Sequence, residues 1–458
     1  METKGTFSHP KGLYILFFTE MWERFSYYGM RALLVLFVVA NVADGGLGWE
    51  KADALALYGN YTMMVYLMSI PGGILADKLL GQKKAVMLGG LLLVAGHGIM
   101  AIPQEWAFFT ALALIVLGVG CLKPNISTMV GGLYKEGDPN RDKGFTIFYI
   151  GINLGAALSS LIVPVVAAEY GWHYGFGLAG IGMLLGQVVY MLGQKHLVGI
   201  GDYINSSTSV DKEVANRPLT KIEQDRVVVL LLSFLIVIVF WGAFEQAGGL
   251  MNLYAQSKTD RYLPMFDYTI PAGVFQSVNA IFIILFGSAV AGFWAWRLKA
   301  GKETSTLLKM AIGTMIMGAG FLFMTAAAAE VQVDASGNII GSSMIWLVLA
   351  YLFHTIGELC VSPTALSFIT KLAPVKYASI MMGVYFAATG LGNKLAGVIG
   401  EHAVSGAGEE QVFTGIAIFA IAFGLILLFF FKKLKALTHG AEDKERDALK
   451  APKAAEAV

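Results

Sequence analysis

The chain has 458 residues, of which 56% are hydrophobic and only 14% are charged, and its mean hydropathy is +0.64. A soluble protein would carry about 25% charged residues, so the composition excludes that class and predicts a helical membrane protein with several spans. The net charge of +1 excludes a nucleic-acid partner, and the continuous apolar runs exclude a membrane β-barrel, whose strands alternate in polarity.

Twelve apolar runs are each long enough to cross a bilayer, which takes about 20 helical residues at roughly 1.5 Å rise per residue. Basic residues gather in alternate loops, for example Lys83, Lys84, Arg141 and Lys143. The positive-inside rule places these loops and both termini in the cytoplasm. The predicted fold class is an all-α integral membrane protein with spans at 13–40, 54–76, 84–102, 106–131, 145–168, 174–194, 227–251, 272–297, 305–328, 343–370, 378–402 and 412–432.

The longest interior loop lies between the sixth and seventh spans and divides the chain into two six-helix halves. A faint repeat links the halves, because Cys121 and Cys360 each precede a mid-helix proline by three residues. Matching kinked helices indicate parallel repeats with a site between them, as in the major facilitator fold. The expected parts are an N-terminal half (1–195), a cytoplasmic linker (196–226), a C-terminal half (227–432) and a cytoplasmic tail (433–458).

The first predicted span carries four charged residues within an apolar run: Glu20, Glu23, Arg24 and Arg31. Each charge at bilayer depth costs roughly 2.5–3.5 kcal/mol on insertion scales. Together with Tyr27, all but Glu23 share one helical face, which must turn toward other helices or a water-filled cavity. One interpretation is an inert network of Glu–Arg pairs that fixes helix register. The other is a polar pathway, in which carboxylates titrate and guanidiniums hold an anionic ligand.

Three further ionisable residues lie near the middle of other spans: Lys123, Glu245 and Glu358. With the charges of the first span they sum to minus one when all are ionised, so at least one carboxylate is predicted to hold a proton in some state. Pairing for stability alone is the weaker explanation, because desolvation roughly offsets the attraction within a buried ion pair.

His354 lies one helical turn before Glu358, a spacing that could present two metal ligands. No second histidine pair supports such a site, so no metal is expected. His97 is interpreted as a core histidine with a satisfied hydrogen bond. Trp241 shares a helical face with Glu245, and Ser362 shares one with Glu358. Further amphipathic candidates along the spans are Tyr66, Tyr149, Asn153, Asn279 and Tyr385.

Several motifs taken together resemble the proton-dependent oligopeptide transporter family of the major facilitator superfamily. The resemblance covers essentially all of the predicted spans, and the motifs are specific in combination, although none would suffice alone. They are E-x-x-E-R-F at Glu20–Phe25, G-G-x-L-A-D-x-x-x-G at Gly72–Gly81, K-P-N at Lys123–Asn125, F-x-x-F-Y-x-x-I-N-x-G at Phe145–Gly155, F-E-Q at Phe244–Gln246 and G-E-L-x-x-S-P at Gly357–Pro363.

This resemblance implies a proton-coupled symporter, not an enzyme, that imports di- and tripeptides by alternating access across a bacterial inner membrane. It implies no cofactor, and its partners would be peptides, protons and the lipid bilayer, with a monomer as one option for the assembly. The implied gates pair Arg31 with Glu245 and Lys123 with Glu358, and Asp77 belongs to the signature loop that braces the halves. The implied proton-coupling residues are Glu20, Glu23, Arg24 and Glu245. The expected substrate-binding residues are Tyr27, Tyr28, Arg31, Tyr66, Lys123, Asn153, Trp241, Asn279, Glu358, Ser362 and Tyr385.

Three features depart from the family pattern. The linker is too short for the two extra helices that bacterial members often carry. Ala365 stands where the family usually has glycine, and Tyr385 stands where many members have tryptophan. These two substitutions leave the preferred peptide open. Three other functions stay as alternatives: transport of another organic solute, such as nitrate or a drug-like molecule, an intramembrane enzyme using His354 and Glu358, and a sensor that binds peptide without flux.

Overall fold

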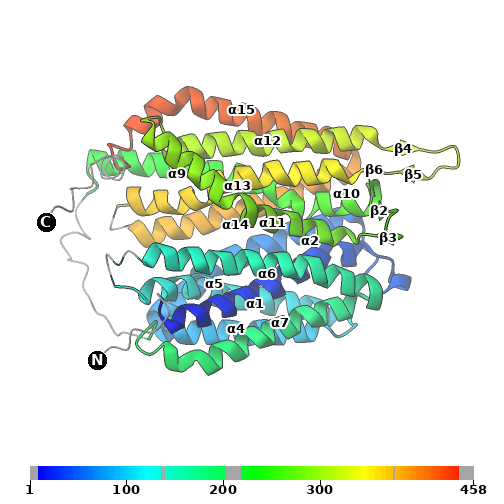
Figure 1. Cartoon of the computed structure of the whole chain (residues 1–458), viewed down its shortest axis with the longest axis horizontal. Coiled ribbons are helices and arrows are strands. Elements are labelled where there is room, and N and C mark those ends of the chain that lie inside the picture. Colours follow the sequence, from blue (N-terminus) through cyan, green and yellow to red (C-terminus); the bar gives the residue numbers. More distant parts are fainter. Residues whose placement is uncertain (1–8, 136–137, 139, 203–217, 375–376, 443–458) are drawn as a thin grey trace.

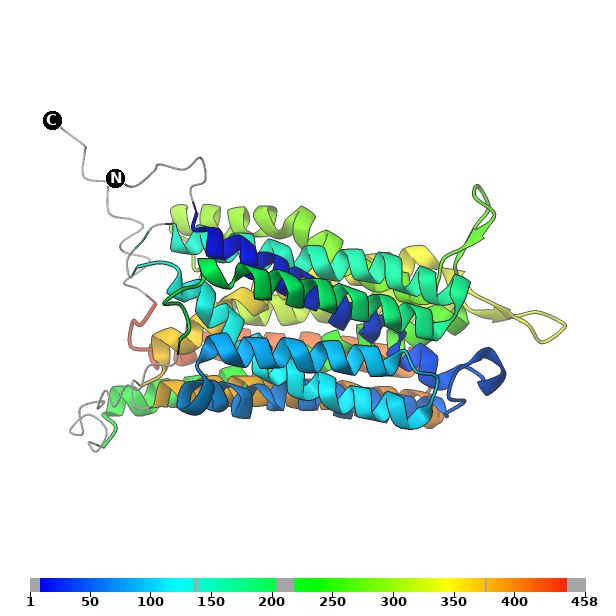
Figure 2. The ribbon, with the colours of Figure 1, turned by 90° about the horizontal axis from the view of Figure 1, so that it is seen from below.

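The computed structural model of the chain describes residues 9–135, 138, 140–202, 218–374 and 377–442. Within these ranges, long helices run side by side along the longest axis, and short strands lie at one end (Figure 1). We call this the hairpin end, and we call the opposite end, where the chain enters the first helix and leaves the last, the terminal end (Figures 1 and 2). Parts of the predicted linker and tail, 203–217 and 443–458, lie outside the described residues.

The helices fall into two sets, one on each side of the stretch 203–217, which we call the N-terminal and C-terminal helices. The N-terminal helices are α1 (Lys11–Val39), α2 (Lys51–Leu67), α3 (Ser69–Leu75), α4 (Gln82–Met100), α5 (Glu105–Gly132), α6 (Arg141–Tyr170) and α7 (Trp172–Leu192). The C-terminal helices are α9 (Lys221–Phe244), α10 (Leu250–Lys258), α11 (Ser277–Lys299), α12 (Thr306–Glu330), α13 (Met344–Leu372), α14 (Ala378–His402) and α15 (Glu409–Ala436). The strands are β1 (Thr259–Asp260), β2 (Tyr262–Leu263), β3 (Tyr268–Thr269), β4 (Gln332–Val333), β5 (Ile339–Ile340) and β6 (Ser342–Ser343).

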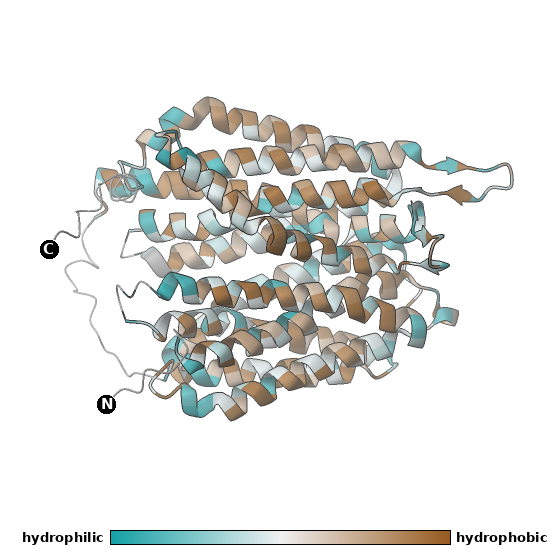
Figure 3. Cartoon of the chain, in the orientation of Figure 1, coloured by the Kyte–Doolittle hydropathy of each residue, from teal (hydrophilic) through white to brown (hydrophobic). Residues whose placement is uncertain are grey.

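Hydrophobic and hydrophilic residues are distributed as expected of a membrane protein. Hydrophobic residues cover the middle lengths of the helices, and hydrophilic residues gather at both ends (Figure 3). Ten helical segments of the described chain are long and apolar enough to cross a membrane. The helices α1 and α14 are not counted in these ten, but they pack against them in the bundle. The predicted all-α membrane class is therefore confirmed, while the count of twelve spans stays a prediction.

Each set of helices packs mainly within itself. On the N-terminal side α1 packs against α6 and α7, and α4 packs against α5. On the C-terminal side α12 packs against α13 and α15, and α9 packs against α14. The two sets meet where α2 packs against α14 and where α6 packs against α11, in the middle of the view in Figure 1. The surface between the sets therefore runs along the length of the bundle.

Two of the predicted spans are broken by irregular turns. The span predicted over 54–76 breaks at Met68, three residues before Pro71, which lacks the N–H that would continue the helical bonding. The span predicted over 227–251 breaks after Phe244, where Glu245–Ala247 form a single 3₁₀ turn followed by Gly248 and Gly249. The second break sets Glu245 at the junction of α9 and α10.

The two cysteine–proline segments adopt the same local arrangement in α5 and α13. In α5, the residue after Pro124 is Asn125, whose side chain donates to the carbonyl oxygen of Cys121 at 2.7 Å. In α13, the residue after Pro363 is Thr364, whose hydroxyl donates to the carbonyl oxygen of Cys360 at 2.9 Å. The faint repeat in the sequence therefore corresponds to a repeated side-chain bond beside each proline.

The contact between α2 and α14 is close because glycines face each other across it. A Cβ atom built on Gly59 would lie 2.9 Å from the Cα atom of Gly397, nearer than real side chains come. Gly390 similarly faces the backbone of Met63. At Gly59 and Gly397 the two helix backbones therefore touch directly, without a side chain between them.

Gly72, the first residue of the signature motif Gly72–Gly81, allows a direct test of the close packing between α3 and α5. A Cβ at Gly72 would collide with the carbonyl oxygen of Gly120 in α5, whereas a Cβ at the neighbouring Gly73 would meet nothing within 4 Å. We expect Gly72→Ala to destabilise the fold by roughly 1–3 kcal/mol, which thermal unfolding in detergent would record as a lower melting temperature. Gly73→Ala is the matched control and should melt within error of the parent. Equal melting of the two variants would contradict the packing described here.

The segment after α15 is fixed to the terminal end of the C-terminal helices. Arg226 Nε donates to the carbonyl oxygen of Thr438 at 3.0 Å, and His439 Nε2 lies 2.8 Å from Asp225 Oδ2. Glu442 accepts the first backbone N–H of α12, from Thr306, at 3.1 Å. The segment thereby joins the start of α9 to the start of α12.

An ion pair between Lys435 and Glu303 adds to this attachment. Partial burial alone would raise the pKa of the Glu303 carboxyl, but hydrogen bonds from Lys435 and from the backbone of Ser305 outweigh burial and lower it. A lowered pKa means that the stabilisation is present at neutral pH and is lost as the pH falls through the folded-state pKa.

Candidate functional site

Three of the four charged residues predicted in α1 form one compact cluster, and the fourth, Arg31, belongs to another. Arg24 Nε lies 3.0 Å from Glu20 Oε1 and 2.5 Å from Glu23 Oε2, and all three side chains are at most 4% exposed. The Arg24 guanidinium also lies 5.6 Å from the ring centroid of Tyr27. One cation thus serves two carboxylates, so either carboxylate can gain or lose a proton while Arg24 keeps a partner.

A second buried charge cluster joins the two sets of helices near the hairpin end. Arg31 Nη1 of α1 lies 3.4 Å from Glu245 Oε1, at the junction of α9 and α10. The hydroxyl of Tyr58 in α2 donates to the other oxygen of Glu245 at 2.6 Å. Nearby, the side chain of Asn252 donates to the carbonyl oxygen of Ala32 at 3.0 Å. These bonds link the two sets of helices near the hairpin end.

Lys123 of α5 lies among aromatic and charged groups of the N-terminal helices. Its ammonium sits 3.9 Å from the ring centroid of Tyr66, a cation–π contact. Glu20, Glu23 and Arg24 are close enough to act electrostatically on Lys123. Its charge is therefore partly balanced from α1, and the side chain remains partly exposed.

Glu358 of α13 is the main carboxylate contributed by the middle of the C-terminal helices. Its Oε2 accepts a hydrogen bond from the side chain of Asn279 at 2.9 Å, and the same amide donates to Thr355 Oγ1 at 3.1 Å. The predicted pairing of Lys123 with Glu358 is not among the ion pairs of the described residues in this conformation. Tyr149 of α6 lies within electrostatic reach of Glu358, so Glu358 faces the N-terminal helices.

The other predicted contact residues divide by their surroundings. Arg31 lies 5.2 Å from the ring centroid of Tyr28, whereas the side chain of Asn153 is committed to the carbonyl oxygen of Tyr149 at 2.9 Å. Asp77 is exposed, in the π-helical turn Ala76–Leu80. The residues that lie between packed helices yet remain partly exposed are Tyr28, Tyr66, Lys123, Trp241, Asn279, Glu358, Ser362 and Tyr385.

The two histidines of interest behave as core residues. His97 is fully buried and its Nε2 lies 2.6 Å from the hydroxyl of Ser26, as expected of a core histidine, but its Nδ1 has no hydrogen-bond partner in the described chain, so the ring is satisfied on one side only. His354 packs against Phe321 with ring centroids 4.5 Å apart and the ring planes tilted by 36°, and it makes no hydrogen bond within the described chain. It does not converge with Glu358, and no cluster of potential metal ligands occurs among the described residues.

Sequence reasoning missed Tyr58, the closest polar partner of Glu245, and Thr355, which accepts a hydrogen bond from the same Asn279 amide that donates to Glu358. A signal for Tyr58 existed, because Tyr58, Thr62 and Tyr66 recur every four residues and mark a polar stripe on α2. Thr355 lies one turn before Glu358, where a hydroxyl more often bonds to its own helix, as Thr355 also does with Tyr351. Only the fold could reveal its second partner.

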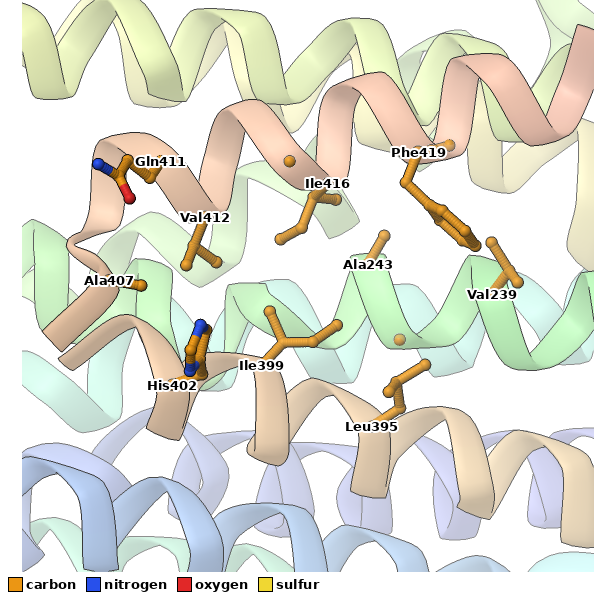
Figure 4. A pocket seen from close by; sticks show the side chains of 13 residues that line it. Val239, Ala243, Leu395, Ile399, His402, Ala407, Gln411, Val412, Ile416 and Phe419 are labelled. Carbon is orange, nitrogen blue, oxygen red and sulfur yellow. The ribbon is translucent and has the colours of Figure 1, made fainter. Parts of the chain in front are cut away.

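A cavity of about 390 Å³ lies apart from these charges, between α9, α14 and α15. Its lining is mostly apolar, including Ala243, Ile399 and Ile416, with His402 and Gln411 near one end (Figure 4). None of the predicted site residues lines it. The charged groups between the two sets of helices, and not this cavity, therefore form the candidate site.

Comparisons with known proteins agree with this arrangement. The model of the POT family matches residues 83–214 and 202–414. The peptide transporter YePEPT of Yersinia enterocolitica is 38% identical over 459 residues, covering 86% of this chain and 88% of that protein. A di-/tripeptide transporter of Lactococcus lactis subsp. cremoris is 34% identical over 493 residues, covering 95% and 97%.

Solved structures show the same fold. A crystal structure of the peptide transporter POT in complex with sulfate has a TM-score of 0.85 at 34% identity, covering 95% of this chain and 97% of that one. A POT family transporter in complex with 5-aminolevulinic acid has a TM-score of 0.85 at 30% identity, covering 95% and 99%.

The helical fold and the buried charges between two helix sets, together with these matches, define a membrane transporter and exclude the intramembrane enzyme as an alternative. The family model covers more than half of the sequence, and similar proteins match over most of their length. The chain belongs to the POT family.

Proposed function

We propose that this protein is a proton-coupled symporter that imports di- and tripeptides by alternating access. The observation that carries the proposal is the division of buried charge between the two sets of helices. The cations Arg24, Arg31 and Lys123 all belong to N-terminal helices, and the carboxylates that face them from the C-terminal helices are Glu245 and Glu358.

A short peptide fits this division because it is itself a dipole. Its carboxylate would meet Arg31 and Lys123, and its ammonium would meet Glu358, with Asn279 holding that carboxylate in place. The groups that every peptide shares would then anchor binding, and the partly exposed aromatic residues Tyr28, Tyr66 and Trp241 would face the variable side chains. Broad specificity for short peptides follows from that arrangement.

Proton coupling would rest on the carboxylates of α1 and on Glu245. Neutralising Glu245 would weaken its attraction for Arg31 and release the hairpin end. Glu20 and Glu23 share Arg24, so a proton on one leaves the other paired. One inward proton at 100 mV supplies about 2.3 kcal/mol, which supports roughly fifty-fold accumulation at that potential alone.

The same proposal fixes the orientation in the membrane. The terminal end would face the cytoplasm of a bacterium, since the basic loops that contain Lys83, Lys84 and Arg141 belong to that end. The hairpin end would face outward. The predicted twelve spans, the two six-helix halves (1–195 and 227–432), the linker (196–226) and the tail (433–458) stand as parts of this proposal.

Uptake of labelled dialanine into proteoliposomes tests the function. An inward proton gradient with a negative interior should drive accumulation that collapses when an uncoupler is added. Binding without uptake would instead favour a peptide sensor. Neither binding nor uptake of dialanine, together with uptake of another labelled small solute such as 5-aminolevulinic acid, would favour a transporter of other organic molecules.

A further inference from the structure

The carboxylate of Glu245 has two donors, and the closer one is neutral. Arg31 Nη1 lies 3.4 Å from Oε1, longer than the usual range of about 2.7–2.9 Å for a charged N–H···O bond. The hydroxyl of Tyr58 donates to Oε2 at 2.6 Å, within the usual range of about 2.5–2.7 Å for an O–H···O⁻ bond. Tyr58 is 1% exposed and Glu245 is 3% exposed, so water does not compete for this bond.

The two donors respond differently when Glu245 takes up a proton. Arg31 has only N–H donors, and a neutral carboxyl group no longer offers it an opposite charge. The Tyr58 hydroxyl can both donate and accept, so it can accept a hydrogen bond from a protonated Glu245. The link between α2 and the junction of α9 and α10 is therefore strong while the carboxylate is charged and weaker, though still available, once Glu245 is neutral.

We propose that Tyr58 is a positioning residue that holds the charged Glu245 across the two sets of helices, and that the weakening of this bond when Glu245 takes up a proton sets the pH at which the hairpin end opens. The inference rests on the proposed proton-coupled transport, and it adds a second contact to the gate formed by Arg31 and Glu245. Because Tyr58 lies on α2, this contact remains when Arg31 turns to a substrate carboxylate.

Other titratable groups face Glu245 from the surrounding helices. Tyr27 of α1, Tyr66 of α2 and Glu358 of α13 lie within electrostatic reach of it. Tyr351 of α13 donates to the carbonyl oxygen of Ala247, which follows Glu245 by two residues. In the described chain none of these groups is hydrogen-bonded to the Glu245 carboxylate, so removing the Tyr58 hydroxyl alters one defined contact.

Tyr58→Phe removes that hydroxyl and keeps the ring. The ionised carboxylate then loses its closest donor, and Glu245 accepts a proton more readily. We expect the external pH that gives half-maximal dialanine uptake to rise by about one pH unit, because a hydrogen bond to a charged group is about twice as strong as one to a neutral group. Tyr61→Phe is the matched control on the same helix, since Tyr61 is 5% exposed and its hydroxyl makes no hydrogen bond in the described chain.

Hydrogen–deuterium exchange separates this inference from the proposed function. Exchange of α10 (Leu250–Lys258) and of Ala272–Gln276, measured against pH without any peptide, reports opening of the hairpin end. Its midpoint should rise in Tyr58→Phe and stay at the parent value in Tyr61→Phe, whatever the transported substrate proves to be. Equal midpoints in all three proteins would overturn the role of Tyr58, even if peptide uptake were established.

Two further proteins keep the test decisive. In a Glu245→Gln background the group that titrates is gone, so adding Tyr58→Phe should produce no further shift. A shift of unchanged size in that background would show that Tyr58 acts elsewhere. A fluorinated tyrosine at position 58, whose hydroxyl is more acidic and a stronger donor, preserves the packing if Tyr58→Phe fails to fold. It should move the midpoint the opposite way, to lower pH, and an upward movement would overturn the inference.

Discussion

Replacing Glu20 or Glu23 by glutamine is expected to abolish gradient-driven peptide accumulation while sparing counterflow exchange. Arg24 contacts both carboxylates, at 3.0 Å and 2.5 Å, so either single substitution leaves the cation one charged partner and the fold intact. The glutamine, however, cannot bind and release a proton. Accumulation of labelled dialanine should fall from roughly fifty-fold at 100 mV to about equality with the outside.

The two assays distinguish coupling from binding. Counterflow exchange needs substrate binding and alternation but no net proton movement, so it should continue near the parental rate. Glu105→Gln, at the exposed start of α5, is the control for loss of a carboxylate as such and should change neither assay. Unchanged accumulation in both the Glu20 and the Glu23 variants would remove them from the coupling mechanism.

Glu358→Gln is expected to weaken binding of unmodified dipeptides by about 30-fold or more. The carboxylate would lose its charge pair with the peptide ammonium, and truncating one partner of such a pair costs about 2–5 kcal/mol, where 1.4 kcal/mol is a factor of ten. Asn279 would still donate to the remaining amide oxygen, so the local packing should survive. Competition of labelled dialanine by unlabelled peptides measures the loss.

A ligand and a variant control this experiment. N-acetylated dialanine has no ammonium, so the parent and Glu358→Gln should bind it with closely similar affinity. His354→Phe, one turn earlier on the same helix, keeps an aromatic ring against Phe321 and should leave dialanine affinity unchanged. Parallel losses for free and acetylated peptides would mean that Glu358 does not recognise the ammonium.

The charge cluster of α1 could be predicted from sequence because the free-energy cost of exposing charges to lipid leaves few places where these side chains can lie. Charges within an apolar helix cannot face lipid, and a spacing of four residues sets Glu20 beside Arg24, as the structure has them. The pair formed by Arg31 and Glu245 was also expected, but from the family resemblance rather than from spacing. The two residues are far apart in the chain, and no local rule brings them together.

Neutral partners and helix breaks were harder to predict. Tyr58 carries no charge, so nothing in α2 alone shows that its hydroxyl meets a carboxylate contributed by another set of helices. The break after Phe244 occurs within a run that hydropathy assigns to one span, because an apolar window is insensitive to a single 3₁₀ turn before two glycines. The contacts of His439 and Glu442 depend on where α9 and α12 begin, which tertiary packing decides.

The crossing of α2 and α14 bears on how fast a transporter of this kind can turn over. At Gly59 and Gly397 the two backbones touch directly, although side chains of α2 pack against other glycines of α14 nearby. Helices whose side chains interlock must pass through a strained, partly unpacked arrangement before they can part, and close-packed interiors resist such passage. Two smooth helix surfaces can slide or separate with a lower kinetic barrier. We therefore expect the contact of Gly59 with Gly397 to bear on the rate of the conformational cycle more than on the affinity for any ligand.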